Sequence, residues 1–300
     1  LYHTWITGVE RTGERIAAVR AVSKTGELSL AGDVFVDATG DGDVAVAAGA
    51  DFVPGSQGIT LMFLLAGVDR QRCPPHEEML DLYRRCGPVN YRGVCLFWAR
   101  RPDTVYVNMT EVEGLQAGDP EDLTRATLEC RSQAWRILDL FRRHIPGFEH
   151  AYMAQTAPAL GVRESRHVRG LYTLTGDDVL AGRDFPDTVA RAACPVDIHG
   201  SANGGRGDYR ALGHSYGVPY RCLVTPGSAN LLVTGRCLSA DAVAHSSVRR
   251  MAPGLALGEA AGMAAARALR RDVRAIDVPA LQQALRGYGA ILDEPHHRPS

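Results

Sequence analysis

The chain has 300 residues, with 33 basic and 34 acidic side chains and a formal net charge of −1 at pH 7. Hydrophobic residues make up 45% and charged residues 22%, as in a globular chain long enough to bury a sizeable core. This composition excludes collagen-like and disordered chains and predicts no attraction to nucleic acid or membrane. No stretch approaches the ~18 apolar residues of a membrane span. The seven cysteines form no C-x-x-C pair, so we expect reduced thiols, no metal site and a cytoplasmic protein.

The first segment of the chain predicts a hairpin. Residues 1–9 and 15–23 alternate in character and flank Gly13, as the strands and turn of a hairpin do. Because the chain starts in this strand-like run without an initiator Met, we expect upstream sequence to be missing.

Strand and helix patterns follow along the chain. Residues 33–40 indicate a buried strand that stops at a tight turn, and Asp41 or Asp43 is expected to cap a helix over 44–50. The remaining expected elements are strands over 59–68, 94–97, 104–109 and 230–235, and helices over 76–85, from Asp119 to about 143, from Pro253 to 271 and over 279–288. Residues 201–207 are predicted to form a loop tip.

Three places with glycine and other small residues favour contact with a ligand. Small residues after the first buried strand, at 37–43, allow close approach to the backbone. A polar turn is the alternative there, whereas calcium is disfavoured because position 12 of such a loop would be Ala48. Residues 235–240 offer backbone N–H groups for a phosphate. Glycines at 254, 258 and 262 share one helix face, which favours close packing on a sheet and a ligand at the helix start.

Charged and titratable residues give further candidates. Arg163 and Arg166 flank Glu164, which fits either an anion site or a structural ion-pair knot. His199 and His245 are each either proton-transfer groups or structural histidines. A serine hydrolase is disfavoured because no G-x-S-x-G elbow occurs.

Six runs together resemble one family. They cover residues 34–50 (VFVDATGDGDVAVAAGA), 59–69, 119–135, 157–190 (with GVRESRH), 195–199 and 218–266. Their order and content resemble the FAD-dependent oxidoreductase family with a glutathione-reductase-type flavin domain. Its relatives include flavoproteins similar to CoB–CoM heterodisulfide reductase.

This resemblance implies FAD as the cofactor, bound at three places. The implied cofactor contacts are Asp37, Ala38, Thr39, Gly40 and Asp41 beside the phosphate arm, Gly235, Arg236, Ser239 and Ala240 at the pyrophosphate and ribityl chain, and Pro253, Gly254, Leu255 and Ala256 at the flavin ring. His199, Arg163, Arg166 and His245 are the implied catalytic residues near that ring.

The family's initial G-x-G-x-x-G element is not found in this sequence. We therefore expect an α/β fold in which an incomplete Rossmann-like FAD-binding domain, without its first βαβ unit, carries an inserted α+β substrate-cap domain. The expected boundaries are 1–58 and 221–300 for the FAD-binding domain and 59–220 for the cap.

The expected function is transfer of a hydride or an electron pair between FAD and a small anionic organic substrate. The alternatives are a noncatalytic or electron-relay flavoprotein subunit, working with an iron–sulfur electron-transfer partner, and an inactive fragment.

Overall fold

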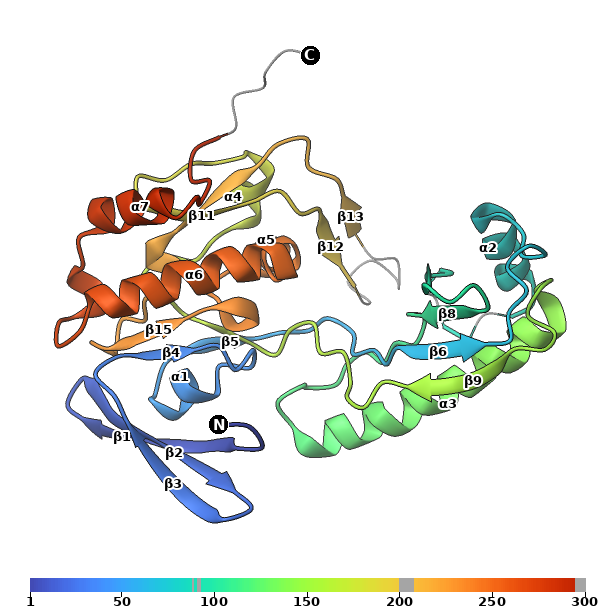
Figure 1. Cartoon of the computed structure of the whole chain (residues 1–300), viewed down its shortest axis with the longest axis horizontal. Coiled ribbons are helices and arrows are strands. Elements are labelled where there is room, and N and C mark those ends of the chain that lie inside the picture. The colour runs from blue at the N-terminus through green and yellow to red at the C-terminus, as the bar shows by residue number, and fades with distance from the viewer. Residues whose placement is uncertain (88, 91–92, 200–207, 295–300) are drawn as a thin grey trace. The chain divides into compact units, whose positions relative to one another are not determined.

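The computed structural model describes residues 1–87, 89–90, 93–199 and 208–294, which fold into two compact units (Figure 1). Unit 1 comprises Leu1–Gly55, Glu164–Ile198 and Asp208–Ser300, and unit 2 comprises Ser56–Arg163 and His199–Gly207. The units divide the chain differently from the expected domains, because residues 164–198 and 208–220 pack in unit 1. The loop predicted over 201–207 lies outside the described residues.

The N-terminal hairpin of unit 1 is confirmed. Strand β1 (Trp5–Thr12) pairs antiparallel with β2 (Arg15–Ser23), and β3 (Gly26–Ala31) adds a third strand. Gly13 has a φ of 60° at the first turn, a left-handed conformation that favours glycine.

A parallel strand pair joins two distant parts of unit 1. Strand β4 (Phe35–Asp37) pairs with β15 (Leu231–Val233), so both carboxyl ends lie at one edge. A tight turn leads from β4 into α1 (Asp43–Ala47). The predicted aspartate cap of α1 is wrong: Gly42 is the N-cap residue, with a φ of 71° and no side-chain cap bond. Its left-handed backbone suits glycine rather than aspartate.

The remaining elements of unit 1 are short strand pairs and helices. The strand pairs are β5 (Phe52–Pro54) with β10 (Arg166–Val168), β11 (Thr188–Ala192) with β14 (Tyr216–Pro219) and β12 (Val196–Ile198) with β13 (Asp208–Arg210), all antiparallel. The helices are α4 (Gly176–Leu180), α5 (Ala242–Val248), α6 (Met251–Arg267) and α7 (Val278–Gly287), with 3₁₀ turns at Tyr220–Cys222, Gly235–Cys237 and Val273–Ala275.

Helix α6 is central to unit 1, between β11 on one side and β4 and β15 on the other (Figure 1). It begins at Met251, so the predicted start at Pro253 is wrong. A proline two residues into the helix is tolerated because the first N–H groups of a helix have no intrahelical acceptor. Its buried side carries Leu257, Ala260, Ala261 and Ala264. The three spaced glycines do not pack on a sheet, since no described atom lies within 4 Å of the Cβ position of any of them.

Unit 2 is a four-stranded antiparallel sheet with helices α2 and α3 (Figure 1). Its strands, in sheet order, are β7 (Leu96–Trp98), β8 (Thr104–Val107), β6 (Phe63–Ala66) and β9 (Tyr152–Thr156). Helix α2 (His76–Arg85) is as predicted, and α3 (Pro120–His144) begins at the predicted cap, where Asp119 accepts from the N–H groups of Glu121 and Asp122. The predicted strand over 59–68 is shorter, because Ile59 and Thr60 form only isolated bridges.

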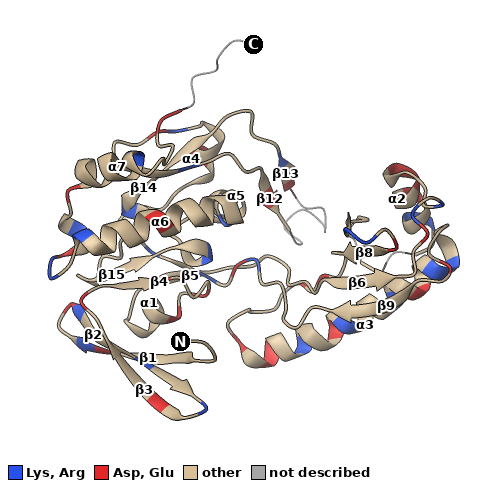
Figure 2. Ribbon diagram, in the orientation of Figure 1, with Lys and Arg blue, Asp and Glu red and all other residues tan. Residues whose placement is uncertain are grey.

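Charged residues and cysteines occur in both units. Figure 2 shows acidic and basic residues interleaved along α3. None of the helices in the described ranges is long and apolar enough to cross a membrane. All seven cysteines lie in those ranges, and none forms a disulfide.

Candidate functional site

The turn after β4 is organised by a buried carboxylate. Asp37 is fully buried, and its Oδ1 accepts from the backbone N–H of Thr39 at 3.0 Å and from the Thr39 hydroxyl at 2.7 Å. Its Oδ2 accepts from the N–H of Ala45 at 2.8 Å. These bonds fix the path of the turn from β4 into α1. Asp37 therefore shapes the backbone of the implied cofactor segment.

Asp41 lies where three predicted site segments meet. Its Oδ1 accepts from the Ser165 hydroxyl at 2.6 Å and lies 3.4 Å from the Arg236 guanidinium. Its carbonyl oxygen accepts from Nη1 of Arg166 at 3.1 Å, and the same nitrogen lies 3.0 Å from Oδ1 of Asp43. The structure thus brings Asp41, Arg166 and Arg236 together, which the sequence did not specify.

Arg236 also requires glycine at position 40. The guanidinium lies over Gly40 so closely that a Cβ there would come within 2.5 Å of a guanidinium nitrogen. Gly40 also has a φ of 83°, in the left-handed region. Only glycine fits this turn without displacing Arg236.

The backbone just beyond β15 is open. Gly235 has a φ of 76°, and no described atom lies within 4 Å of its Cβ position. The hydroxyl of the preceding residue, Thr234, is buried and has no hydrogen-bond partner among the described residues. Ser239 is buried further along, with its hydroxyl 3.1 Å from that of Thr173. Gly235 and Arg236 are therefore the accessible residues of the predicted 235–240 segment, whose other residues are buried.

The start of α6 is likewise open. Its N-cap residue, Arg250, makes no side-chain cap bond to the helix. Pro253 is buried, Leu255 is 76% exposed, and nothing lies within 4 Å of the Cβ position of Gly254. The first turn of α6 therefore combines an uncapped, positively polarised helix end with accessible backbone.

The four predicted catalytic residues divide between the units. Arg163 and His199 belong to unit 2, and Arg166 and His245 to unit 1. Arg163 is buried and donates from Nη1 to the carbonyl oxygen of Gly58 at 2.6 Å, with a Glu111 carboxylate oxygen 3.9 Å away. Arg163 thus has a backbone acceptor and a carboxylate close to it within unit 2.

His199 is half-buried, and its backbone N–H donates to the side-chain oxygen of Gln57 at 3.1 Å. His199 and Arg166 are thus the two predicted catalytic residues that are only partly buried.

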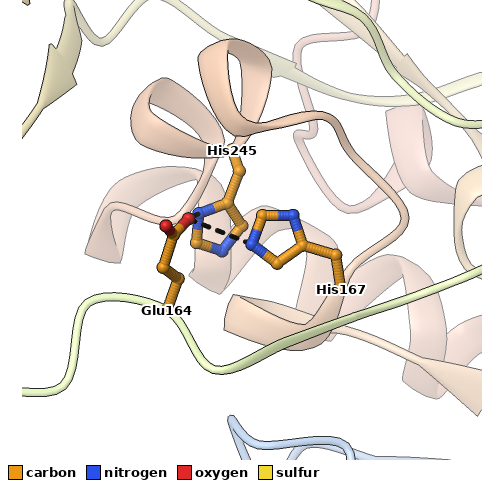
Figure 3. Close-up of side chains that lie close together, drawn as sticks. All are labelled: Glu164, His167 and His245. Carbon is orange, nitrogen blue, oxygen red and sulfur yellow. Dashed lines mark hydrogen bonds and ion pairs between the residues drawn. The ribbon is translucent and has the colours of Figure 1, made fainter. Parts of the chain in front are cut away.

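A buried cluster of Glu164, His167 and His245, the EHH cluster, was missed at the sequence level (Figure 3). Nε2 of His167 lies 3.0 Å and Nδ1 of His245 3.4 Å from the same carboxylate oxygen, Oε2 of Glu164. The two rings are stacked, with centroids 4.1 Å apart. Burial lowers the pKa of His245 below its usual range, while the Glu164 carboxylate acts in the opposite direction.

The two histidines of the EHH cluster contact the backbone of the predicted 235–240 segment. Nε2 of His245 lies 2.7 Å from the carbonyl oxygen of Arg236, and Nδ1 of His167 lies 2.9 Å from that of Ala240. A carbonyl only accepts hydrogen bonds, so both nitrogens carry protons. The E-x-x-H spacing of Glu164 and His167 was visible in the sequence, but the contribution of His245 depends on the tertiary fold.

Comparison with known proteins identifies the family of the chain. Residues 1–285 match the family model described as FAD dependent oxidoreductase, and the chain therefore belongs to that family. FAD is its cofactor, and the chain is a flavoprotein oxidoreductase by family. The narrower resemblance to heterodisulfide reductase stays an expectation. A search of curated proteins found no match.

Several solved structures match at low similarity. A triple mutant of the flavin-dependent brominase Bmp2 has 17% identity and a TM-score of 0.39, with 95% of this chain and 55% of that chain covered. A geranylgeranyl bacteriochlorophyll reductase-like protein from Thermoplasma acidophilum has 11% identity and a TM-score of 0.42, with 95% and 53% covered. L-proline dehydrogenase from P. horikoshii has 13% identity and a TM-score of 0.38, with 96% and 55% covered.

The chain thus spans about half the length of these structures.

Two of the predicted cofactor-binding positions leave room for a bound group. The open backbone at Gly235 and Gly254 allows a large planar or phosphorylated group to approach, and the uncapped start of α6 favours an electron-rich one. Gly235 and Gly254 are consequently the positions at which contact with FAD is best tested.

Proposed function

We propose that this chain transfers a hydride or an electron pair between FAD and a small, anionic organic substrate. The observation that carries the proposal is the open backbone at Gly235, at the carboxyl edge shared by the parallel strands β4 and β15. Ligands of open α/β sheets bind at this edge, because the loops and helix starts that follow the strands converge there.

Three segments of unit 1 would hold the cofactor. The turn at 37–41, shaped by Asp37, would lie beside the phosphate arm. Gly235, with the Arg236 guanidinium, would contact the pyrophosphate, since backbone N–H groups and arginine both suit phosphate oxygens. The first turn of α6, at Gly254, would face the flavin ring.

When bound, FAD supplies the two-electron acceptor and donor. The chain's contribution at α6 is electrostatic. An uncapped helix N-terminus stabilises nearby negative charge by roughly 0.3–1 kcal/mol, and more in a buried setting. Reduced flavin is more negative than oxidised flavin, so this helix start would favour the reduced form.

The two units would have different roles, FAD binding in unit 1 and substrate binding in unit 2. We assign β4, β15 and α6 to a Rossmann-like FAD-binding domain, and the sheet of unit 2 with α2 and α3 to a substrate cap. The assignment is supported by the parallel β4–β15 pair in unit 1 and the fully antiparallel sheet in unit 2.

His199 is the proposed proton-transfer group. Hydride transfer to or from carbon requires a proton donor or acceptor on the substrate, and histidine serves this purpose near neutral pH. His199 is half-buried rather than fully buried, which is compatible with substrate contact. His245 is fully buried, so we give it no direct contact with substrate.

Arg166 is the better of the two proposed anion-binding arginines. Its side chain is 23% exposed, against 8% for Arg163. Arg166 also lies beside the Asp41 turn, whereas Arg163 donates to Gly58 within unit 2.

A variant pair tests the proposed role of His199. The substrates would be drawn from a panel of 2-hydroxy acids, amino acids and dicarboxylates, with a dye as the electron acceptor. His199→Asn should lower turnover by about 100-fold or more at unchanged FAD content, the range for losing a general acid–base. His150→Asn is the matched control, because His150 is an exposed histidine of the same unit and should leave turnover unchanged.

Unchanged turnover in His199→Asn would remove His199 from the chemistry. A flavin that no anionic substrate reduces, in a chain with full FAD content, would contradict the proposed substrate class.

A further inference from the structure

The EHH cluster brings three possible metal-ligand atoms close together. Oε2 of Glu164, Nε2 of His167 and Nδ1 of His245 all lie within 4.8 Å of one another (Figure 3). The side chains are almost fully buried, at 1%, 5% and 0% exposed. A buried convergence of acceptors is unfavourable unless a cation or a proton lies among them.

A backbone carbonyl group determines which nitrogen of each imidazole carries a proton. Nδ1 of His167 faces the Ala240 carbonyl, and Nε2 of His245 faces the Arg236 carbonyl. Each of these nitrogens must donate, so in a neutral ring the opposite nitrogen, which faces Glu164, carries a lone pair. A carbonyl behind each histidine is the usual outer-shell arrangement around metal-binding imidazoles.

The hydrogen-bond geometry around His245 agrees with a lone pair. Its Nδ1 is buried and satisfies no hydrogen bond, although Oε2 of Glu164 lies 3.4 Å away. A proton on this nitrogen would therefore have no well-aligned acceptor among the described residues.

Two of the three spacings among the donor atoms, those from the Glu164 carboxylate oxygen, suit a metal ion. With metal–ligand bonds of about 2.0–2.1 Å, neighbouring ligand atoms are about 3.4 Å apart in a tetrahedron and about 2.9 Å apart in an octahedron. The distances from Oε2 of Glu164 are 3.0 Å to His167 and 3.4 Å to His245. Two imidazoles and one carboxylate are a ligand set for zinc and for divalent iron.

The residues come from elements that hold them in place. Glu164 lies just before β10 and His167 lies on it, and β10 pairs with β5. His245 lies on α5. Helix α5 is capped by Asp241, which accepts from the N–H of Ala244 at 2.8 Å.

We propose that Glu164, His167 and His245 bind one divalent first-row transition metal ion, with Zn²⁺ as the reference ion. The ion joins β10 to α5 and, through the two histidines, holds the carbonyl groups of Arg236 and Ala240. Its role is structural: it fixes the 236–240 segment. The inference does not depend on FAD binding, since all three ligands and both carbonyls belong to the chain.

Metal binding is measured on the untagged chain without FAD. The protein is freed of metal with a chelator and titrated with Zn²⁺ against a chromophoric competitor, and bound metal is counted by elemental analysis. The expected result is one Zn²⁺ per chain, and Co²⁺ in its place should give a visible d–d absorption band from nitrogen and oxygen ligands. His167→Gln, His245→Gln and Glu164→Gln should each weaken Zn²⁺ binding by about 100-fold or more.

Two control variants separate this site from incidental binding. His214→Gln removes another half-buried histidine that bonds a carbonyl, that of Val179, and should keep full Zn²⁺ affinity. A double variant, His296→Gln with His297→Gln, removes the adjacent histidines near the C-terminus and should also keep it.

A wild-type chain that binds less than one tenth of an equivalent of Zn²⁺ and shows no Co²⁺ band would overturn the proposal, and the trio would then hold a proton. Equal Zn²⁺ affinity in folded ligand variants would overturn it as well. If the ligand variants do not fold, the wild-type stoichiometry and the Co²⁺ band decide.

Discussion

Gly235→Ala separates a structural role of this glycine from a cofactor role. The residue has a φ of 76°, so alanine there pays the left-handed penalty of roughly 1–2 kcal/mol. No described atom lies within 4 Å of the Cβ position, so no clash within the chain adds to this cost. The free energy of unfolding should consequently fall by about 1–2 kcal/mol and no more.

The effect of Gly235→Ala on FAD should be larger than on folding. If the cofactor occupies the open space over Gly235, a methyl group there should raise the Kd for FAD at least about tenfold, or about 1.4 kcal/mol. Gly13→Ala is the matched control, because Gly13 has a φ of 60° and nothing within 4 Å of its Cβ position. It should lose similar stability and keep its FAD affinity.

Urea denaturation and FAD fluorescence titration measure the two quantities. A folded Gly235→Ala chain with wild-type FAD affinity would refute the placement of the cofactor over Gly235. A comparable loss of affinity in Gly13→Ala would show that the effect arises from backbone strain alone.

Three further outcomes follow from the structure. Gly254→Leu should keep its stability or gain up to about 1 kcal/mol of unfolding free energy, because leucine favours helices, but it should lose FAD. Gly262→Leu, in the same helix, should keep FAD, and equal FAD content in the two variants would contradict the placement of FAD at Gly254. Asp119→Ala should lower the unfolding free energy by about 1 kcal/mol, because it removes the N-cap of α3. Asp139→Ala, which removes only a surface ion pair with Arg143, should lower it by a few tenths of a kcal/mol, and equal losses in denaturation would argue against the cap. Burial and the charge of Asp69 raise the pKa of Cys73 to about 11. Alkylation of Cys73 by iodoacetamide at pH 8, followed by mass spectrometry, should therefore be about 100-fold slower than that of free cysteine, and it should become faster as the pH rises toward 11. An alkylation rate equal to that of free cysteine would refute the raised pKa.

Local patterns in the sequence predicted the elements that local physics determines. Helix α2 was predicted from its apolar spacing, and the start of α3 from an aspartate followed by a proline. Both signals act within one or two helical turns. The cap of α1 was missed because a glycine in the left-handed region, at position 42, ended the turn between two plausible aspartates.

Contacts between distant segments could not be predicted. Nothing near Arg163 in the sequence identifies Gly58 and Glu111 as its neighbours, and nothing near His245 identifies Glu164. These contacts depend on how sheets and helices pack. The candidate cofactor segments were instead predicted from their small residues and from the resemblance to a family. The match over residues 1–285 confirms membership of the FAD-dependent oxidoreductase family, and the segments themselves stay a prediction.

The central claim is that FAD lies over the carboxyl edge of β4 and β15. The most direct measurement is a crystal structure of the chain with FAD bound. The expected result is a cofactor in van der Waals contact with both Gly235 and the first turn of α6 at Gly254. An ordered FAD molecule that touches neither glycine would contradict the account.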